Sequence, residues 1–236
     1  MNKVWALAKR AARWLGIVVL AWLVVSIVAV FSLRWFDPPT TSFILRDRLA
    51  AWWHGDPNYH FEHEWVSYNR IAPSMKLAVI TAEDQKFPDH YGFDFDSMQK
   101  AWEHNQHGRK VKGASTISQQ VAKNLYLWPG RSLVRKAIEA YFTLLLETFC
   151  SKQRILEIYL NSAEFGKGLF GVEAASKRVF HKSALQLNGS EAALLAAVLP
   201  APKRLLANKP SNYLRTRQAW IETQMPQVDT NGILAP

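Results

Sequence analysis

Residues 14–33 form a run of twenty residues without a charged side chain, bounded by Arg13 and Arg34. A helix of this length rises about 30 Å, which is the thickness of the hydrocarbon core of a bilayer. A cleaved signal peptide is the alternative, but its apolar region usually has about 7–15 residues and is followed by a small-residue cleavage site. The segment Phe31-Ser32-Leu33-Arg34-Trp35 contains no such site. We therefore predict a transmembrane helix over residues 14–34.

The charges that flank this run predict its orientation. Lys3, Lys9, Arg10 and Arg13 precede it without an acidic residue among them. Basic residues stay on the cytoplasmic side of a membrane, so residues 1–13 are predicted to be a cytoplasmic tail. Everything after Arg34 then lies outside the cytoplasm, and the chain crosses the membrane once.

The net charge of +10 falls to a modest surplus once this tail is set aside. Residues 1–34 hold five basic and no acidic residues, which leaves 24 basic against 19 acidic residues in the rest of the chain. With no zinc-finger spacing and no RNA-binding aromatic motif, this surplus excludes a nucleic-acid partner and fits an anionic membrane surface. The single Cys150 excludes an internal disulfide and is expected to be a buried small hydrophobe.

Beyond the membrane segment, the pattern of apolar residues predicts a mainly α ectodomain. Asp37-Pro38-Pro39-Thr40-Thr41 breaks the helix, and residues 35–60 are predicted to be a spacer before a domain at 61–225. Ser132 and Ser151 have the residue type of helix N-caps. A tail over residues 226–236 is expected to be loosely ordered. Helical periodicity recurs in the segments 117–125, 132–149, 152–160, 174–179 and 190–199.

Three short motifs match known signatures in the wrong context. Gly166 to Gly171 satisfies G-x-G-x-x-G, but it follows a predicted helix and not a strand, so an interhelical turn is expected. Ser97-Met98-Gln99-Lys100 matches the S-x-x-K of transpeptidases, yet no K-T-G follows. His60-Phe61-Glu62-His63 has no nearby residues to complete a metal site. No metal ligand set is predicted from these motifs.

A carboxylate and a polar helix form the strongest candidate site. Glu83 ends an apolar segment, and the helix predicted from Ser115 brings hydroxyls, amides and one ammonium in its first turns. Lys123 follows Gln119 by one turn, so both can face a common anion, and free N–H groups at the helix start favour phosphate. Such a set can deprotonate a hydroxyl beside an anionic leaving group. The alternative is a solvated helix end with ordinary charges.

A second carboxylate follows with its own basic residues. Arg131 and Arg135 flank Glu139, and Arg135 and Glu139 stand four residues apart. The alternative for this pair is an ion pair on a helix surface, which contributes a few tenths of a kcal/mol.

The stretch between these motifs predicts a lipid-contacting segment. Phe95, Met98 and Trp102 fall on one helical face, with basic residues nearby at Lys100, Arg109, Lys110 and Lys112. Basic residues interleaved with large apolar ones suit an interfacial helix. Burial of the same face in the core is the alternative.

Five blocks of residues, in order, resemble one known family. They are Glu83-Asp84-Gln85-Lys86-Phe87 with His90, Gly92 and Asp94; Gly113-Ala114-Ser115-Thr116-Ile117 with Gln119-Gln120 and Lys123-Asn124; Arg135-Lys136 with Glu139 and Leu146-Glu147; Ile155-Leu156-Glu157-Ile158-Tyr159-Leu160-Asn161 with Phe165-Gly166 and Gly168; and Glu191-Ala192 with Leu199-Pro200 and Pro202. The chain thereby resembles the monofunctional biosynthetic peptidoglycan glycosyltransferases, family 51, over roughly residues 62–202. Lys112 stands where the family often has Arg.

The resemblance implies a lysozyme-like helical fold, with a head and a smaller lobe near the membrane. It also implies a reaction. Glu83 would be the general base that takes the proton from the 4-hydroxyl of the acceptor sugar of lipid II. That hydroxyl attacks the lipid-linked end of the growing glycan chain, and undecaprenyl pyrophosphate leaves with inversion.

Further residue roles follow from the resemblance alone. Lys123 and Arg131 would neutralise the pyrophosphate, and Glu139 would assist directly or through a divalent cation, Mg²⁺ or Mn²⁺. The implied contacts to sugar and phosphate are Ser115, Thr116, Gln119, Gln120 and Asn124.

The resemblance places the protein in the bacterial inner membrane with its catalytic domain in the periplasm. The expected partners are lipid II, the lipid-linked glycan chain, the membrane, and cell-wall synthesis and division proteins. Two other functions stay open: a lytic enzyme of the same fold class, and a non-catalytic scaffold. A lytic enzyme has no pyrophosphate for Lys123 to neutralise, and a scaffold has no need for both Glu83 and Glu139.

Overall fold

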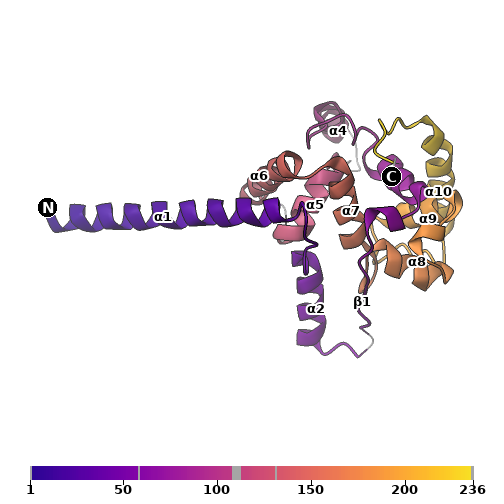
Figure 1. The fold of residues 1–236 in the computed structure, drawn as a ribbon, viewed down its shortest axis with the longest axis horizontal. Coiled ribbons are helices and arrows are strands. Elements are labelled where there is room, and N and C mark those ends of the chain that lie inside the picture. The colour runs from indigo at the N-terminus through magenta and orange to yellow at the C-terminus, as the bar shows by residue number, and fades with distance from the viewer. Residues whose placement is uncertain (1, 58, 108–112, 131, 235–236) are drawn as a thin grey trace.

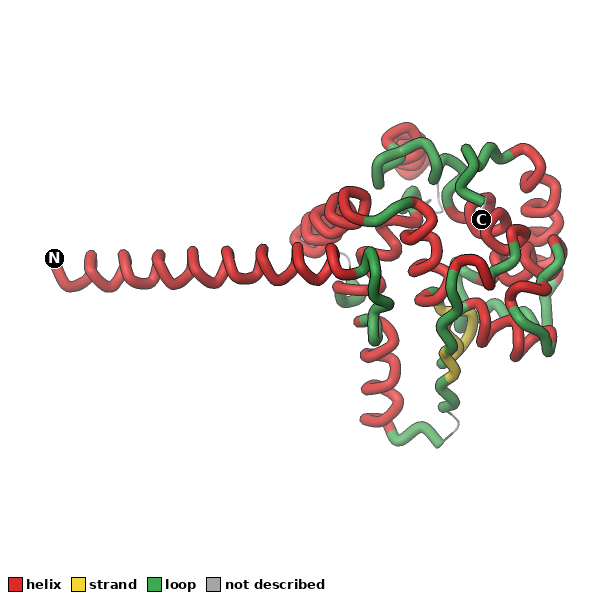
Figure 2. The backbone as a smooth tube through the Cα atoms, viewed as in Figure 1, coloured by secondary structure: helices red, strands yellow, loops and turns green. Residues whose placement is uncertain are grey.

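The computed structural model describes residues 2–57, 59–107, 113–130 and 132–234, and most of these are helical (Figures 1 and 2). The mainly α prediction is confirmed. The helices are α1 (Asn2–Ser32), α2 (Ser42–His54), α3 (Pro73–Glu83), α4 (Phe95–His107), α5 (Ile117–Tyr126), α6 (Leu133–Phe149), α7 (Lys152–Ser162), α8 (Val172–Phe180), α9 (Gly189–Val198) and α10 (Asn212–Gln224), with short 3₁₀ turns at Tyr68–Arg70, Ala184–Gln186 and Met225–Gln227.

Helix α1 leaves the domain as a long projecting rod (Figure 1). Its segment Leu7–Ser32 contains a stretch that is long and apolar enough to cross a membrane, with a mean hydropathy of 2.7, and almost all of this stretch is exposed. Only its C-terminal part packs on the domain, where the Ser26 hydroxyl lies 2.7 Å from that of Tyr141 and the Trp22 ring stacks against Tyr141. An exposed apolar helix of this length fits a single-pass membrane anchor.

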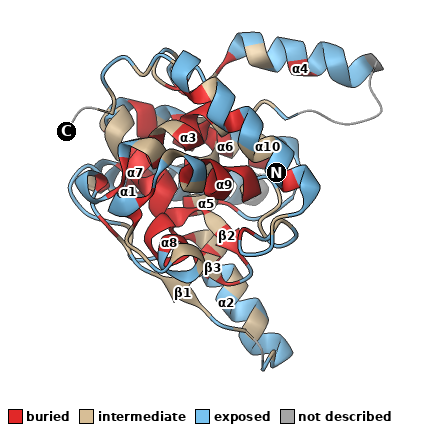
Figure 3. Ribbon diagram, turned by 90° about the vertical axis from the view of Figure 1, so that its right-hand side faces the viewer, coloured by how far each residue is buried: buried red, intermediate tan, exposed pale blue. Residues whose placement is uncertain are grey.

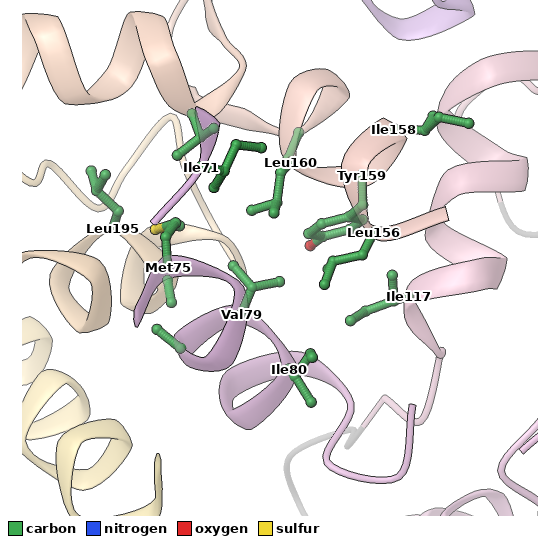
Figure 4. Close-up of a cluster of buried hydrophobic side chains, with 14 of the residues drawn as sticks. Ile71, Met75, Val79, Ile80, Ile117, Leu156, Ile158, Tyr159, Leu160 and Leu195 are labelled. Carbon is green, nitrogen blue, oxygen red and sulfur yellow. The ribbon is translucent and has the colours of Figure 1, made fainter. Parts of the chain in front are cut away.

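The core lies where α9 inserts between α3 and α10 (Figure 3). Every residue from Ala192 to Val198 is buried, which suits a helix that is apolar on all sides. Helix α5 packs in turn between α6 and α7. Figure 4 shows side chains of α3, α5, α7 and α9 meeting in one cluster, among them Met75, Val79, Ile117, Leu156, Tyr159 and Leu195.

Hydroxyl caps fix where the helices begin. Ser132 and Ser151 accept hydrogen bonds from the backbone N–H groups of Arg135 and Arg154, so both predicted N-caps are confirmed. Helix α5 begins with a capping box, in which the Thr116 side chain and the Gln119 side chain each satisfy the other residue's backbone. The first turn of α5 is therefore held by its own side chains.

The glycine-rich segment after α7 is a β-hairpin, so the prediction of an interhelical turn was wrong. Strands β2 (Glu164–Gly166) and β3 (Leu169–Phe170) pair antiparallel, and β1 (Glu62–His63) pairs parallel with β3, in the order β1-β3-β2. Gly168 has a φ of +70° in the connecting turn, and a Cβ there would lie 2.2 Å from the His60 carbonyl oxygen. Strands this short carry too little alternation to be recognised in a sequence.

Two segments expected to lack structure are ordered by long-range contacts. The predicted spacer contains α2, which begins at the N-cap Thr41. The tail expected to be loosely ordered is held to the domain at Ile233, whose carbonyl accepts the Tyr68 hydroxyl at 2.5 Å. The Gln153 side chain donates to the same carbonyl. These contacts come from distant parts of the chain, so no local pattern could reveal them.

Candidate active site

Glu83 lies at the C-terminal end of α3, where α5 and α10 also meet. The Gln120 amide of α5 donates to its carboxylate at 3.0 Å, and the Arg217 guanidinium of α10 lies 3.6 Å from its other oxygen. The Glu83 side chain is only 14% exposed. One hydrogen bond and one nearby cation do not replace the water that this buried carboxylate has lost, so its charged form is less stable than in water.

Burial raises the pKa of Glu83 above its ordinary value. The hydrogen bond from Gln120 and the positive charges of Arg217 and Lys123 oppose this shift, and the negative charge of Asp84 adds to it. A carboxylate with a raised pKa is a stronger proton acceptor than a solvated one, which is what a general base requires.

A buried hydroxyl orients the Gln120 amide. The Tyr159 hydroxyl donates to the Gln120 carbonyl oxygen at 3.2 Å, so the amide nitrogen faces Glu83. Burial raises the pKa of Tyr159 well above its usual value, and the phenol therefore stays a donor. The order of donation from Tyr159 to Gln120 to Glu83 is thereby fixed.

Asp84 ties the end of α3 to the start of α5. Its buried carboxylate accepts the backbone N–H of Ile117 at 2.9 Å and lies 3.0 Å from the His90 ring nitrogen. An anion at a helix N-terminus satisfies free N–H groups and the helix dipole. Because Ile117 begins α5, this contact fixes Gln120 and Lys123 relative to Glu83.

Gly92 makes room for the same junction. Its carbonyl accepts the Thr116 hydroxyl at 2.7 Å, and its φ is +83°. A Cβ at this position would lie 2.7 Å from the Thr143 methyl and 3.1 Å from the Glu147 side chain. Only glycine permits α6 to approach the first motif this closely.

Lys123 places an ammonium between the two carboxylates of the site. Burial lowers its pKa, while the negative charges of Glu139 and Glu83 oppose that shift. Its nitrogen lies 5.6 Å from the Phe43 ring centroid. Within the described part of the chain this ammonium forms no ion pair, so its charge is available to an anionic ligand.

Glu139 lies in the interior of α6 with two cations. The Arg135 guanidinium donates to one of its oxygens at 2.7 Å, and the Lys136 ammonium donates to the other. The Glu139 side chain is 3% exposed, so the alternative of an ion pair on a helix surface was wrong. A buried pair of this kind fixes geometry more than it stabilises the fold.

The described residues do not fit a protein-held metal ion. Both oxygens of Glu139 are engaged by Arg135 and Lys136, and no group of three potential acidic, His or Cys ligands occurs in the described ranges. A divalent ion needs oxygen ligands with charge to spare. The Glu139 carboxylate has little negative charge left for a metal ion, because two cations already neutralise it.

The predicted site residues therefore fall into distinct groups. Glu83, Gln120 and Lys123 lie together, and Glu139 lies beyond Lys123. Three polar residues make structural contacts at the two ends of α5. Thr116 and Gln119 cap its start, and the backbone carbonyl of Asn124 near its end accepts the Ser42 hydroxyl. The buried Gln119 amide nitrogen keeps no partner among the described residues, and Ser115 is exposed just before the helix. Arg131 lies outside the described residues.

Three residues near Glu83 were not predicted. Asp84 was part of a quoted motif without a role, and its position beside Glu83 was the signal that could have suggested one. Tyr159 was quoted within the fourth block, also without a role. Arg217 reaches the site from α10, more than 130 residues along the chain, and nothing in its neighbourhood distinguishes it from a surface arginine.

Comparison with known proteins identifies the family. Residues 52–226 match the family model described as transglycosylase. The chain belongs to the transglycosylase family. A protein of Xanthomonas campestris pv. campestris (strain B100) is 46% identical over 227 residues, covering 96% of this chain and 92% of that protein. Proteins of Cronobacter sakazakii and Escherichia coli O139:H28 are 52% and 55% identical, covering 92% and 85% of this chain and 90% and 83% of their own lengths.

All three relatives are named biosynthetic peptidoglycan transglycosylase. The transglycosylase match contains Glu83, Lys123, Glu139 and Arg217. It begins at residue 52, so α1 and most of α2 precede it. The matched region therefore contains the candidate site.

The raised pKa of Glu83 predicts a pH-dependent cost to folding. The folded state holds the Glu83 proton more tightly than the unfolded state, so this group's contribution to stability is present below the unfolded pKa of about 4.5 and is lost as pH rises. Glu83→Gln has no charge to desolvate. We expect its stability advantage over the wild type to grow from pH 4 towards pH 7.5, measured by urea unfolding.

Glu222→Gln is the matched control, because Glu222 is exposed on α10. Its unfolding free energy should follow the wild type across the pH range. A Glu83→Gln curve parallel to the wild type would contradict the burial argument.

Proposed function

We propose that this chain polymerises the glycan strands of peptidoglycan, transferring the lipid-linked glycan chain to the 4-hydroxyl of the GlcNAc of lipid II. The observation that carries this is the pairing of a buried carboxylate, Glu83, with an ammonium, Lys123, that has no ion-pair partner in the described residues. One end of such a site accepts a proton and the other accepts an anion. The names of the relatives supply the substrate class.

The proposed proton transfer uses Glu83 as the general base. Its raised pKa favours capture of the proton from the attacking 4-hydroxyl. Gln120 holds one carboxylate oxygen at 3.0 Å, so the carboxylate cannot rotate freely while the acceptor sugar approaches. A hydroxyl that loses its proton as it attacks C1 from the face opposite the leaving group gives inversion.

The proposed leaving group is undecaprenyl pyrophosphate. Negative charge develops on its bridging oxygen as the bond to C1 breaks, and a fixed cation in a desolvated site stabilises that charge strongly. Lys123 is the residue proposed for this role, and the start of its helix, α5, is held by Asp84. Glu139 acts by positioning Arg135 and Lys136, and Arg131 stays a prediction. We keep the substrate contacts of Ser115, Gln119 and Asn124 as predictions.

A divalent cation also stays a prediction. Such an ion would be held chiefly by the pyrophosphate oxygens, because Mg²⁺ is commonly bound by substrate phosphates with one or two carboxylates. No step proposed here passes through it.

The two alternative functions have no observation in their favour. A lytic enzyme cleaves between sugars and has no pyrophosphate, which leaves the buried Lys123 without a purpose. A scaffold would not keep Glu83 buried at a cost to stability. The proposed setting is the bacterial inner membrane, with α1 crossing once, its N-terminus in the cytoplasm and the domain in the periplasm. Wall-synthesis and division proteins are proposed partners.

The face of α4 predicted to contact lipid is exposed. Phe95 and Trp102 are 71% and 64% exposed, so the alternative of burial in the core was wrong. The three basic residues at 109, 110 and 112 lie outside the described residues. We propose that α4 contacts the bilayer that holds the polyprenyl substrates.

Replacing Phe95 and Trp102 with Ser should weaken membrane contact through α4. In vesicle flotation of a protein lacking residues 1–34, we expect several-fold lower binding, because two large apolar side chains are lost. Leu185 and Trp220, also exposed, replaced together by Ser are the matched control. Unchanged binding of the Phe95 and Trp102 variant would rule out the proposed role of α4.

Labelled lipid II tests the polymerase directly. Purified wild type should give long glycan strands on a gel, and Glu83→Gln none, because the base is lost. Lys123→Met should lower the rate by about a hundredfold or more, since a fixed charge opposite the developing anion is removed. Lys209→Met, in an exposed loop, should leave the rate unchanged. Full activity of Glu83→Gln would overturn the assignment of the base.

Arg217 should set the acid limb of the pH profile. Its charge lowers the pKa of Glu83 against the effect of burial, so Arg217→Gln should raise that pKa further. The acid limb of kcat/KM for strand formation should then move to higher pH. Arg215→Gln, exposed on the same helix, should leave the limb in place. An unmoved limb in Arg217→Gln would show that this charge is screened.

A further inference from the structure

Helix α2 presents a continuous apolar stripe that no part of the described chain covers. Leu45, Leu49, Trp52 and Trp53 recur at the spacing of one helical face, and all four side chains are exposed. The two tryptophans are 75% and 78% exposed, with ring centroids 6.5 Å apart. Exposed apolar stripes of this kind mark a binding surface.

The stripe has a positive charge on each border. At 100° per residue, Arg46 and Arg48 fall on the two sides of the stripe, and both are exposed. Ile44 on the protein side is also apolar, so the helix as a whole is not strongly two-faced. In a helix docked on a domain, however, only the outward half meets a partner. That half is apolar with arginine borders, the composition of helices that lie in a membrane interface.

Contacts on the opposite side of α2 fix the direction of the stripe. Asp47, on the face away from it, accepts the Tyr59 hydroxyl at 3.0 Å and pairs with Lys203. The Ser42 hydroxyl donates to the carbonyls of Asn124 and Leu127, which anchors the start of α2 to the end of α5. Helix α2 is thus a rigid arm whose apolar stripe faces away from the strand side of the domain.

The direction of α1 identifies what lies in front of the stripe. Figures 1 and 2 show α2 running crosswise to α1, level with the end of the apolar rod and projecting to one side. The chain that follows Gly55 lies on the side of α2 away from the rod, and Asp47 bonds to Tyr59 of that segment. The stripe therefore faces the side on which α1 extends. If α1 spans a bilayer, α2 lies flat at the surface where α1 emerges.

We propose that α2 is an interfacial helix that rests on an anionic bilayer, with its tryptophans at the headgroup level and its arginines on lipid phosphates. The transglycosylase match begins at residue 52, so Leu45 and Leu49 precede it and the two tryptophans are its first two residues. The proposal needs α1 in a bilayer and does not depend on the glycosyl transfer proposed above. Its effect would be to hold the domain in one orientation over the membrane.

Spin labelling of the full-length chain tests this surface. Cys150 is the only cysteine, so a Cys150→Ala background accepts one nitroxide at Leu49→Cys or Trp53→Cys. Nanodiscs of phosphatidylethanolamine and phosphatidylglycerol are the probe. Collision with a water-soluble nickel chelate should be several-fold lower at 49 and 53 than at the control Tyr213→Cys on α10, and collision with oxygen higher. Tyr213 is exposed, and its helix, α10, lies on the side of the domain away from α1 (Figure 1).

Nickel accessibility at 49 and 53 equal to that at 213 would overturn the proposal. Spin–spin broadening at 49 in discs with two chains would also overturn it, because the occupant would be a second copy. Exchange of phosphatidylglycerol for phosphatidylcholine should raise nickel accessibility in the parent but not in an Arg46→Gln, Arg48→Gln variant. If nickel accessibility changed equally in the parent and in this variant, the proposed contact between the arginines and the lipid headgroups would be wrong. Should a labelled variant fail to fold, the label at Leu45 reads the same stripe.

Discussion

The contact between Asp84 and the start of α5 is the constraint on which the site depends. One buried carboxylate accepts the Ile117 N–H and lies against His90, so the end of α3 and the beginning of α5 move as one unit. Glu83 is the neighbour of Asp84, and Gln120 and Lys123 are within two turns of Ile117. The spacing between the proposed base and the proposed anion site is therefore set by a structural contact in which neither takes part.

The two carboxylates of the site are buried in opposite ways. Glu139 is matched by Arg135 and Lys136, so its charge is neutralised and its position is fixed. Glu83 has a single hydrogen bond and one cation at 3.6 Å, and burial leaves its charged form poorly stabilised. The proposed function needs this difference, because a fully paired carboxylate is a weak base. The fold tolerates Glu83 since α3, α5, α7 and α9 bury an extensive apolar core around it.

The sequence predicted the parts of this structure that depend on local pattern. Apolar periodicity found α5, α6, α7, α8 and α9, and hydroxyls found the caps at Ser132 and Ser151. The one-turn spacing of Gln119 and Lys123 predicted a shared anion site, and in the structure the Gln119 side chain caps the start of α5. The sequence could not predict what distant segments contribute. Arg217 reaches Glu83 from α10, Asp47 fixes α2 through Tyr59 and Lys203, and Ile233 closes on Tyr68. Such contacts depend on packing that no neighbouring residues encode.

Helix α6 connects the membrane to the chemistry. On one side of it, Glu139 pairs with Arg135 and Lys136. On the opposite side, Tyr141 contacts Trp22 and Ser26 of α1. Phe149 extends this contact to Phe31. A rigid helix held by the anchor on one face must keep its other face at a fixed height above the bilayer. In the proposed function, a substrate whose pyrophosphate lies at the membrane surface would then meet the cations while its polyprenyl tail stays in the lipid.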